Sequence, residues 1–173
     1  MSNKAIAVCV RIAVEAHQHQ FRWDGTPYMN HIISVWNNVT KLILKDKMFV
    51  LSDRNFAIVQ CCALLHDVVE DCMSADDLRE KLKEIGDIEI EYLIFDTVVN
   101  ELTHTKESTY AEYVGRISSL QGLISKYCDV QHNMGCSMQN IADNHDIERA
   151  AKQIKKYGSI LPGLTAKLNH FKD

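Results

Sequence analysis

Apolar residues recur at helical spacing along most of the chain. In the first such segment, about residues 4–19, they include Ile6, Val10, Ala13 and Val14. Side chains three or four positions apart share one face of a helix, whereas strands alternate with a period of two. Almost no segment alternates in that way, so the pattern predicts an all-α fold.

Local signals mark the boundaries of the expected elements. Asp24-Gly25 is a turn dipeptide, Pro27 precedes a new helix, Ser74 resembles an N-cap and Gly86 a C-cap. A charged loop is expected at 45–54. Beyond the first segment, helices are predicted at about residues 29–44, 57–71, 75–85, 88–102, 110–132 (one helix or two), 146–157 and 162–171.

The segment 57–71, AIVQCCALLHDVVED, organises the rest of the chain. Its first half is apolar except for Gln60, as expected of a helix surrounded by protein. At about 100° per residue, the side chains of His66, Asp67, Glu70 and Asp71 fall on one face of a continuous helix. Ionisable groups in such a place are costly unless they are paired or coordinated, so a metal site is the economical explanation.

Composition limits the class of protein. The chain has 173 residues, 46% of them hydrophobic, and no Pro-, Gly- or Ser-rich linker, so we expect one compact domain over residues 1–173. The net charge is -4 and the basic residues are scattered, which argues against a nucleic-acid partner. No run has the length and apolarity of a membrane span, and no signal-peptide core is seen, so we expect a cytoplasmic protein.

Two remote residues could complete a metal site. His31 opens the second predicted helix, and Asp129 lies in the apolar-flanked run LISKYCDVQHNM. With His66 and Asp67 they form a mixed set of imidazoles and carboxylates, which suits Mn²⁺ or a similar octahedral ion.

The order and spacing of these residues resemble a known family. FRWDGTPYMNH, LLHDVVED, LTHTKESTYAEYVGRI and KYCDVQHNM together resemble the HD-domain superfamily of metal-dependent phosphohydrolases. Within it they are similar to the hydrolase domain of the Rel/SpoT family and to the single-domain small alarmone hydrolases. The resemblance covers about residues 16–134 and leaves a C-terminal helical extension from about residue 140 to 173.

The resemblance implies a role for each matching residue. His31, His66, Asp67 and Asp129 would bind a single Mn²⁺. Two acids would position and deprotonate the attacking water, and four residues match substrate-side motif positions. The acids are Glu70 and Asp71; the substrate-side residues are Arg22 against the base, Asn133 at the ribose, and Tyr28 and Lys126, for which structural roles are open.

Four positions depart from the family pattern. The family often has lysine where Trp23 stands and arginine where Val130 stands, and it commonly places other residue types where this chain has Cys136 and Gln139. The metal and water positions are kept, while the surroundings of the base and phosphates have changed. Activity is therefore better supported than substrate.

The resemblance implies a substrate, and the departures leave alternatives open. It implies an enzyme of the stringent response that hydrolyses a small-molecule nucleotide, removing the 3′-pyrophosphate from ppGpp or pppGpp. An HD phosphohydrolase of NADPH or of a deoxynucleotide is the first alternative. A sensor that binds a nucleotide without cleaving it is the second.

The remaining histidines and one helix face are expected to be mostly structural. His17, His19, His104 and His132 are predicted to be structural or surface residues. A face carrying Tyr110, Tyr113 and Arg116 is predicted to pack beside the pocket, where one of the three could touch phosphate.

Overall fold

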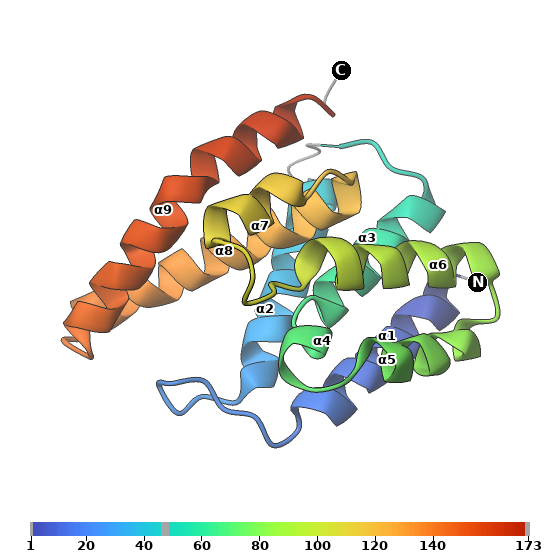
Figure 1. The fold of residues 1–173 in the computed structure, drawn as a ribbon, viewed down its shortest axis with the longest axis horizontal. Helices are drawn as coiled ribbons and strands as arrows, with labels where there is room; N and C mark the ends of the chain where they lie inside the picture. The colour runs from blue at the N-terminus through green and yellow to red at the C-terminus, as the bar shows by residue number, and fades with distance from the viewer. Residues whose placement is uncertain (1, 46–48, 172–173) are drawn as a thin grey trace.

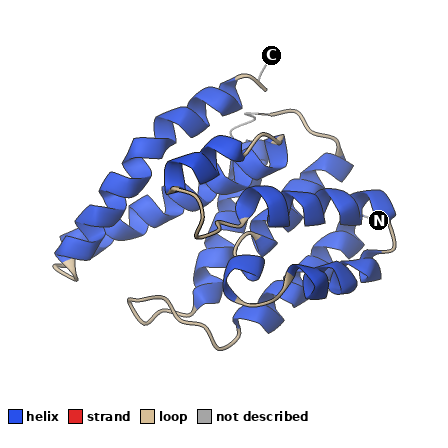
Figure 2. Ribbon diagram, viewed as in Figure 1, coloured by secondary structure: helices blue, strands red, loops and turns tan. Residues whose placement is uncertain are grey.

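Helices form almost all of the regular structure in the computed structural model, which describes residues 2–45 and 49–171 (Figures 1 and 2). Within these residues no strand is present, and a single isolated β-bridge joins Phe21 to Pro27. The prediction of an all-α fold is confirmed. The elements are α1 (Ser2–His17), α2 (Tyr28–Thr40), η1 (Lys41–Lys45), α3 (Asp53–Leu65), α4 (Val68–Asp71), α5 (Ala75–Leu82), η2 (Lys83–Ile85), α6 (Ile88–Asp96), η3 (Thr97–Leu102), α7 (Tyr110–Arg116), α8 (Leu120–Ala142) and α9 (Ile147–Asn169).

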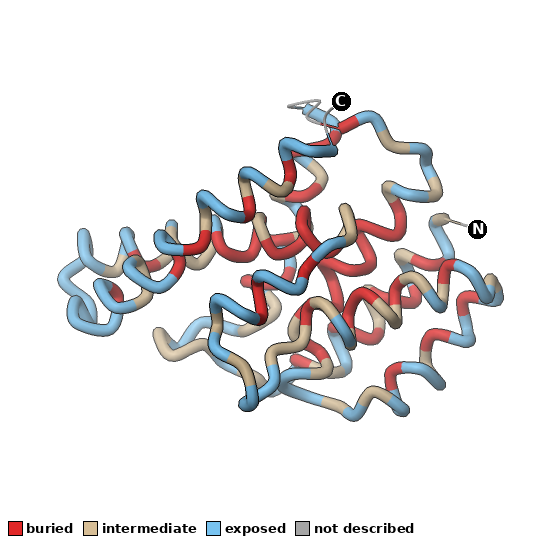
Figure 3. The backbone as a smooth tube through the Cα atoms, turned by 45° about the horizontal axis from the view of Figure 1, so that its top comes forward, coloured by how far each residue is buried: buried red, intermediate tan, exposed pale blue. Residues whose placement is uncertain are grey.

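Helix α3 lies at the centre of the molecule and packs against α1, α2, α6 and α8. Every residue from Ala57 to Leu65 is buried, which confirms the expectation of a helix surrounded by protein (Figure 3). Its one polar member in this stretch, Gln60, accepts a hydrogen bond of 2.8 Å from the indole of Trp36. Burial of α3 fixes the position of the residues that follow it.

Several predicted boundaries are confirmed by capping contacts. Ser74 accepts a hydrogen bond from the backbone N–H of Asp77, and Gly86 takes the left-handed conformation, with φ +74°, that ends the following turn. Gly25 has φ +82° in the predicted turn before α2. Of the expected loop at 45–54, residues 46–48 lie outside the described part of the chain, and α3 already begins at Asp53.

The prediction of one helix over residues 57–71 is wrong, because the chain breaks at His66 and Asp67. The His66 imidazole lies 2.7 Å from the carbonyl oxygen of Ala63, an acceptor that a continuous helix uses for its own backbone. Asp67 has φ −108° and ψ −1°, and α4 then restarts with a hydrogen bond from the N–H of Asp71 to the carbonyl of Asp67. The side chains therefore do not follow a single helical wheel.

The segment 110–132 forms two helices, and the second extends well past residue 132. The break at residues 117–119 is held by Glu101, whose carboxylate accepts hydrogen bonds from the backbone N–H groups of Ser118 and Ser119. Ser119 then caps α8 by accepting from the N–H of Gly122.

The C-terminal region is one helix, so the prediction of separate helices at 146–157 and 162–171 is wrong. Helix α9 runs antiparallel to α8 and continues through Pro162 (Figure 1). A proline inside a helix costs about 3 kcal/mol. Burial of Tyr157, Ile160, Leu164 and Leu168 on one face offsets this cost, and these residues belong to the same hydrophobic core as α3.

Candidate metal centre and substrate cavity

Three parts of the fold meet at the proposed metal site. The start of α2 supplies His31, the break between α3 and α4 supplies His66 and Asp67, and the middle of α8 supplies Asp129. His31, His66 and Asp129 are buried, and their ligand atoms all lie within 4.8 Å of one another. Residues far apart in sequence are thus brought together, as the sequence predicted for these three.

The ligand atoms have spacings that a metal ion fits. Nε2 of His31 lies 3.1 Å from Nε2 of His66, 3.3 Å from Oδ1 of Asp129 and 3.5 Å from Oδ2 of Asp67. Oδ2 of Asp67 lies 3.0 Å from Nε2 of His66. Two donors at right angles and about 2.1 Å from one ion are about 3.0 Å apart, so this donor set suits a divalent cation of the first transition row.

Neighbouring groups orient both imidazoles. Nδ1 of His66 lies 2.7 Å from the carbonyl oxygen of Ala63, which can only accept, so Nδ1 carries the proton and Nε2 is left free to face the site. Nδ1 of His31 lies 2.9 Å from Nδ1 of His132. His132 is therefore no surface histidine: it supports a proposed ligand. Burial, together with the charges of His31 and Arg22, lowers the pKa of His132 to about 4.

Both carboxylates are held by a second partner. The hydroxyl of Tyr28 donates to Oδ2 of Asp67 at 2.6 Å, and the ammonium of Lys126 lies 2.8 Å from Oδ2 of Asp129. Although burial opposes ionisation, the Lys126 ammonium keeps the pKa of Asp129 well below its usual range, and His66 does the same for Asp67. Tyr28 and Lys126 also line the cavity, and their partners are Asp67 and Asp129, so both support carboxylates of the proposed metal site.

The two acids that follow lie beside this centre, and each has one hydrogen-bond donor. Oε2 of Glu70 accepts from the backbone N–H of His104 at 3.1 Å, and Oδ2 of Asp71 accepts from the amide of Gln20 at 2.9 Å. Burial and the nearby carboxylate of Asp67 raise the pKa of Glu70. A carboxylate with a raised pKa is a better proton acceptor for catalysis near neutral pH.

Arg22 and Asn133 form a joined pair. Nη2 of Arg22 donates to Oδ1 of Asn133 at 2.9 Å, and the amide of Asn133 donates in turn to Oδ1 of Asp129. The Nε atom of Arg22 is buried with no partner among the described residues. This chain connects the proposed base-binding arginine to a proposed metal ligand.

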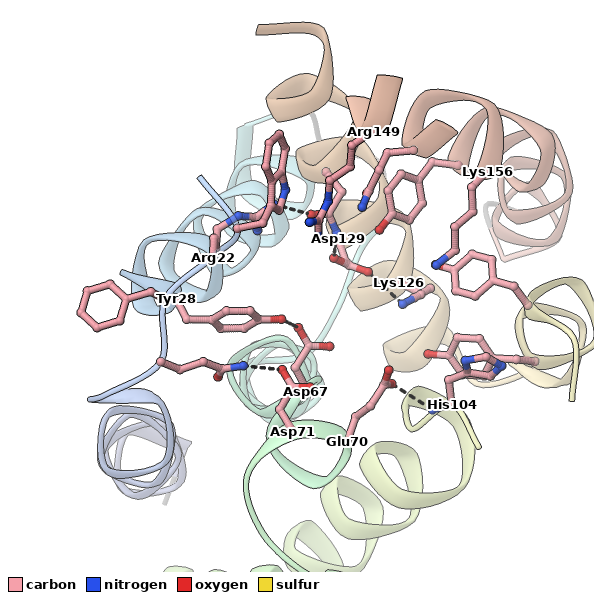
Figure 4. Close-up of a pocket in the computed structure, with 18 residues that line it drawn as sticks. Arg22, Tyr28, Asp67, Glu70, Asp71, His104, Lys126, Asp129, Arg149 and Lys156 are labelled. Carbon is pink, nitrogen blue, oxygen red and sulfur yellow. Dashed lines mark hydrogen bonds and ion pairs between the residues drawn. The ribbon is translucent and has the colours of Figure 1, made fainter. Parts of the chain in front are cut away.

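A cavity of about 360 Å³ opens above these residues (Figure 4). Most of the predicted site residues line it, although His31 and His66 lie beneath its surface. Its lining residues are Gln20, Phe21, Arg22, Trp23, Tyr28, Asp67, Glu70, Asp71, His104, Tyr110, Tyr113, Lys126, Asp129, Asn133, Arg149, Gln153, Lys156 and Tyr157.

The contribution of α9 to this cavity was not predicted from the sequence. Arg149, Gln153, Lys156 and Tyr157 all line it, on one face of that helix. Arg149 and Lys156 are seven residues apart, a spacing that places both on one face of a helix. The sequence does not show that this face meets a cavity, because that depends on α9 folding back along α8. Two cations thus enter the cavity from a segment outside the motifs.

Of the four departures from the family pattern, only Trp23 lines the cavity. Its ring stacks on His145 at 5.5 Å between centroids, and the guanidinium of Arg149 lies 4.8 Å from its ring centroid. Val130 is buried in the core, and Gln139 is exposed and bonded to Asp143. Cys136, the fourth, is half-buried beside His132.

Only part of the helix face that was predicted to pack beside the pocket does so. Tyr110 and Tyr113 line the cavity, whereas Arg116 is exposed and lies outside it. His17 is buried and stacks on Tyr28, and His19 is exposed, as expected of structural and surface histidines.

A scan against protein-family models and a search of curated proteins found no match to the chain. Among residues 2–45 and 49–171, no helix combines the length and apolarity needed to cross a membrane.

Proposed function

We propose that this protein is a cytoplasmic, metal-dependent phosphohydrolase of the HD-domain type. Its substrate is ppGpp or pppGpp, from which it removes the 3′-pyrophosphate and leaves GDP or GTP. The divalent ion, Mn²⁺ in this proposal, is held by His31, His66, Asp67 and Asp129. When bound, such an ion offsets the negative charge of the phosphate and makes a neighbouring water more acidic.

The observation that supports this proposal is a single cavity that holds both acids and cations. The buried ligand set lies at this cavity with two further carboxylates, Glu70 and Asp71. Cations also line it, among them Arg22 and Arg149. A nucleotide needs both kinds of group, because its reacting phosphate must meet the metal and base while its remaining charge needs cations.

The residues of the chain account for the movement of the proton. Glu70 accepts it from the attacking water, whose oxygen bonds to the phosphorus attached to the 3′ oxygen. The bond between this phosphorus and the 3′ oxygen breaks, the 3′ oxygen takes a proton from solvent, and Glu70 returns its proton to solvent. The N–H of His104 holds Glu70 in position, and Gln20 holds Asp71.

The base and ribose side of the cavity has its own residues. Arg22 presents a planar guanidinium that can stack on a base, and its bond to Asn133 fixes both side chains. Stacking accepts any base, so guanine specificity needs more than Arg22.

A second candidate substrate is a nucleotide with fewer phosphates, such as NADPH or a deoxynucleotide. The observation in its favour is Trp23, an indole at a position where the family often has a cation, lying flat against His145 and Arg149. A bulky apolar ring there offers a stacking surface and no charge to a further phosphate.

The test is turnover by the purified protein with Mn²⁺ on ppGpp, pppGpp, NADPH and the deoxynucleoside triphosphates, with products identified by mass. Pyrophosphate with GDP or GTP supports the proposal. Phosphate from NADPH, or triphosphate from a deoxynucleotide, moves the activity to the second candidate. Tight binding of a nucleotide without turnover would instead indicate a sensor, and Asp129→Ala serves as the inactive control.

A further inference from the structure

Helix α9 places a lysine, Lys156, in the cavity beside two aromatic rings. The ammonium of Lys156 lies 3.8 Å from the ring centroid of Tyr110 and 5.3 Å from that of Tyr157. Among the described residues it forms no ion pair, unlike Lys152 one turn earlier, which lies 2.6 Å from Glu148. An aromatic face holds a cation in place without cancelling its charge, so Lys156 stays available to an anion.

The other lysine of the cavity differs in this respect. Lys126 also approaches the Tyr110 ring, at 5.6 Å, but its ammonium is paired with Asp129 at 2.8 Å. Burial and the charge of Lys126 lower the pKa of Lys156 and outweigh the opposing effect of the Asp129 and Glu70 carboxylates, so its ammonium is only partly compensated where it stands. A bound anion would supply the missing counter-charge.

The position of Lys156 indicates which anion this is. Lys126 and Lys156 both point into the cavity on the side away from Tyr28, with Glu70 and His104 beside them (Figure 4). The phosphoryl group that reacts has to lie at the metal ligands and Glu70. Among the described residues Lys156 forms no ion pair with these acids, and it lines the same cavity, so it is available to a group bound next to the reacting one.

Resting on the proposed function, we propose that Lys156 binds the second phosphoryl group of the pyrophosphate that is removed. The cavity would then select substrates whose reacting phosphorus carries a further phosphate. A monophosphate ester, such as the 2′-phosphate of NADPH, would leave Lys156 without a partner and would bind less well.

The test compares the binding of two inorganic probes, pyrophosphate and phosphate, by isothermal titration of the Mn²⁺-loaded protein. Three variants join the wild type: Lys156→Met, Lys156→Arg, and Lys152→Met as the matched control on the same helix. We expect Lys156→Met to bind pyrophosphate about tenfold more weakly, as for the loss of one charge-assisted contact, with phosphate binding little changed. Lys156→Arg and Lys152→Met should resemble the wild type.

Two results would overturn the assignment: unchanged pyrophosphate binding in Lys156→Met, or an equal loss for phosphate and pyrophosphate. Chelation of Mn²⁺ by pyrophosphate in solution is common to all four proteins and cancels in the comparison. If ppGpp is hydrolysed while Lys156→Met binds pyrophosphate normally, only the role of Lys156 fails. If no nucleotide is hydrolysed by the wild type, the proposed function fails, and a selective loss in Lys156→Met would still leave an anion site at α9.

Discussion

The phenol of Tyr28 donates a hydrogen bond of 2.6 Å to Oδ2 of Asp67. This contact joins the first residue of α2 to the break between α3 and α4. It fixes the direction of a carboxylate that lies within 3.5 Å of both imidazoles of the candidate metal site. Tyr28 is therefore placed to position a ligand.

Removing this hydroxyl should weaken metal binding. We expect Tyr28→Phe to lower Mn²⁺ affinity by about 10- to 100-fold, the usual effect of losing a group that orients a ligand. Tyr127→Phe is the matched control, because Tyr127 contacts Gln131 outside the cavity. Calorimetric titration with Mn²⁺ measures both, and equal affinities for Tyr28→Phe and the wild type would contradict the prediction.

Substitution of Asp129 and Glu70 should separate metal binding from proton transfer. Asp129→Ala removes a buried carboxylate of the ligand set and should abolish metal binding and turnover together. Glu70→Ala leaves that set intact, so we expect metal to stay bound while turnover falls by about 10²- to 10⁴-fold, as for loss of a general base. Metal analysis after gel filtration, together with steady-state rates, tests both, and full activity in either variant would refute its assigned role.

Loss of Arg22 should affect substrate binding more than chemistry. Arg22, the proposed base-binding residue, lines the cavity and donates a hydrogen bond to Asn133. We expect Arg22→Ala to raise KM more than it lowers kcat. Arg116→Ala is the control, since Arg116 is exposed and lies outside the cavity. An unchanged KM would show that the base is held elsewhere.

The metal-free protein should lose stability as the pH rises above neutral. Burial lowers the pKa of His66, but Asp67 and Asp129 outweigh it and raise the pKa to about 9. Because this pKa lies above the ordinary 6.5, protonated His66 stabilises the folded protein fully below about pH 6.5. This stabilisation is lost as the pH rises through about 9.

Thermal unfolding followed by circular dichroism checks this dependence. In metal-free protein we expect Tm to fall from pH 6.5 to pH 8, and to fall less in Asp129→Asn, which lacks one of the two carboxylates that raise the pKa. With Mn²⁺ present the trend should reverse, because a ligand imidazole has to be neutral. A Tm that rises with pH in the metal-free protein would contradict the assigned shift.

The sequence by itself determined the fold class and most of the local boundaries. Helical periodicity gave the all-α fold, and short-range rules placed the cap at Ser74 and the turns at Gly25 and Gly86. These features depend on contacts a few residues apart, which the order of residues specifies directly. The sequence also singled out His31, His66 and Asp129, because buried ionisable groups in apolar helices need a reason to be there.

Only the tertiary structure decided how the cavity is completed. The continuation of α9 through Pro162 and the arrival of Arg149 and Lys156 in the cavity depend on packing between distant segments. Burial of the apolar face of α9 against α8 outweighs the local cost of a proline, and it brings Arg149 and Lys156 into the cavity that the acids of α4 also line. Local helix propensity includes the cost of the proline but not the burial that offsets it, because the residues that bury α9 lie far along the chain.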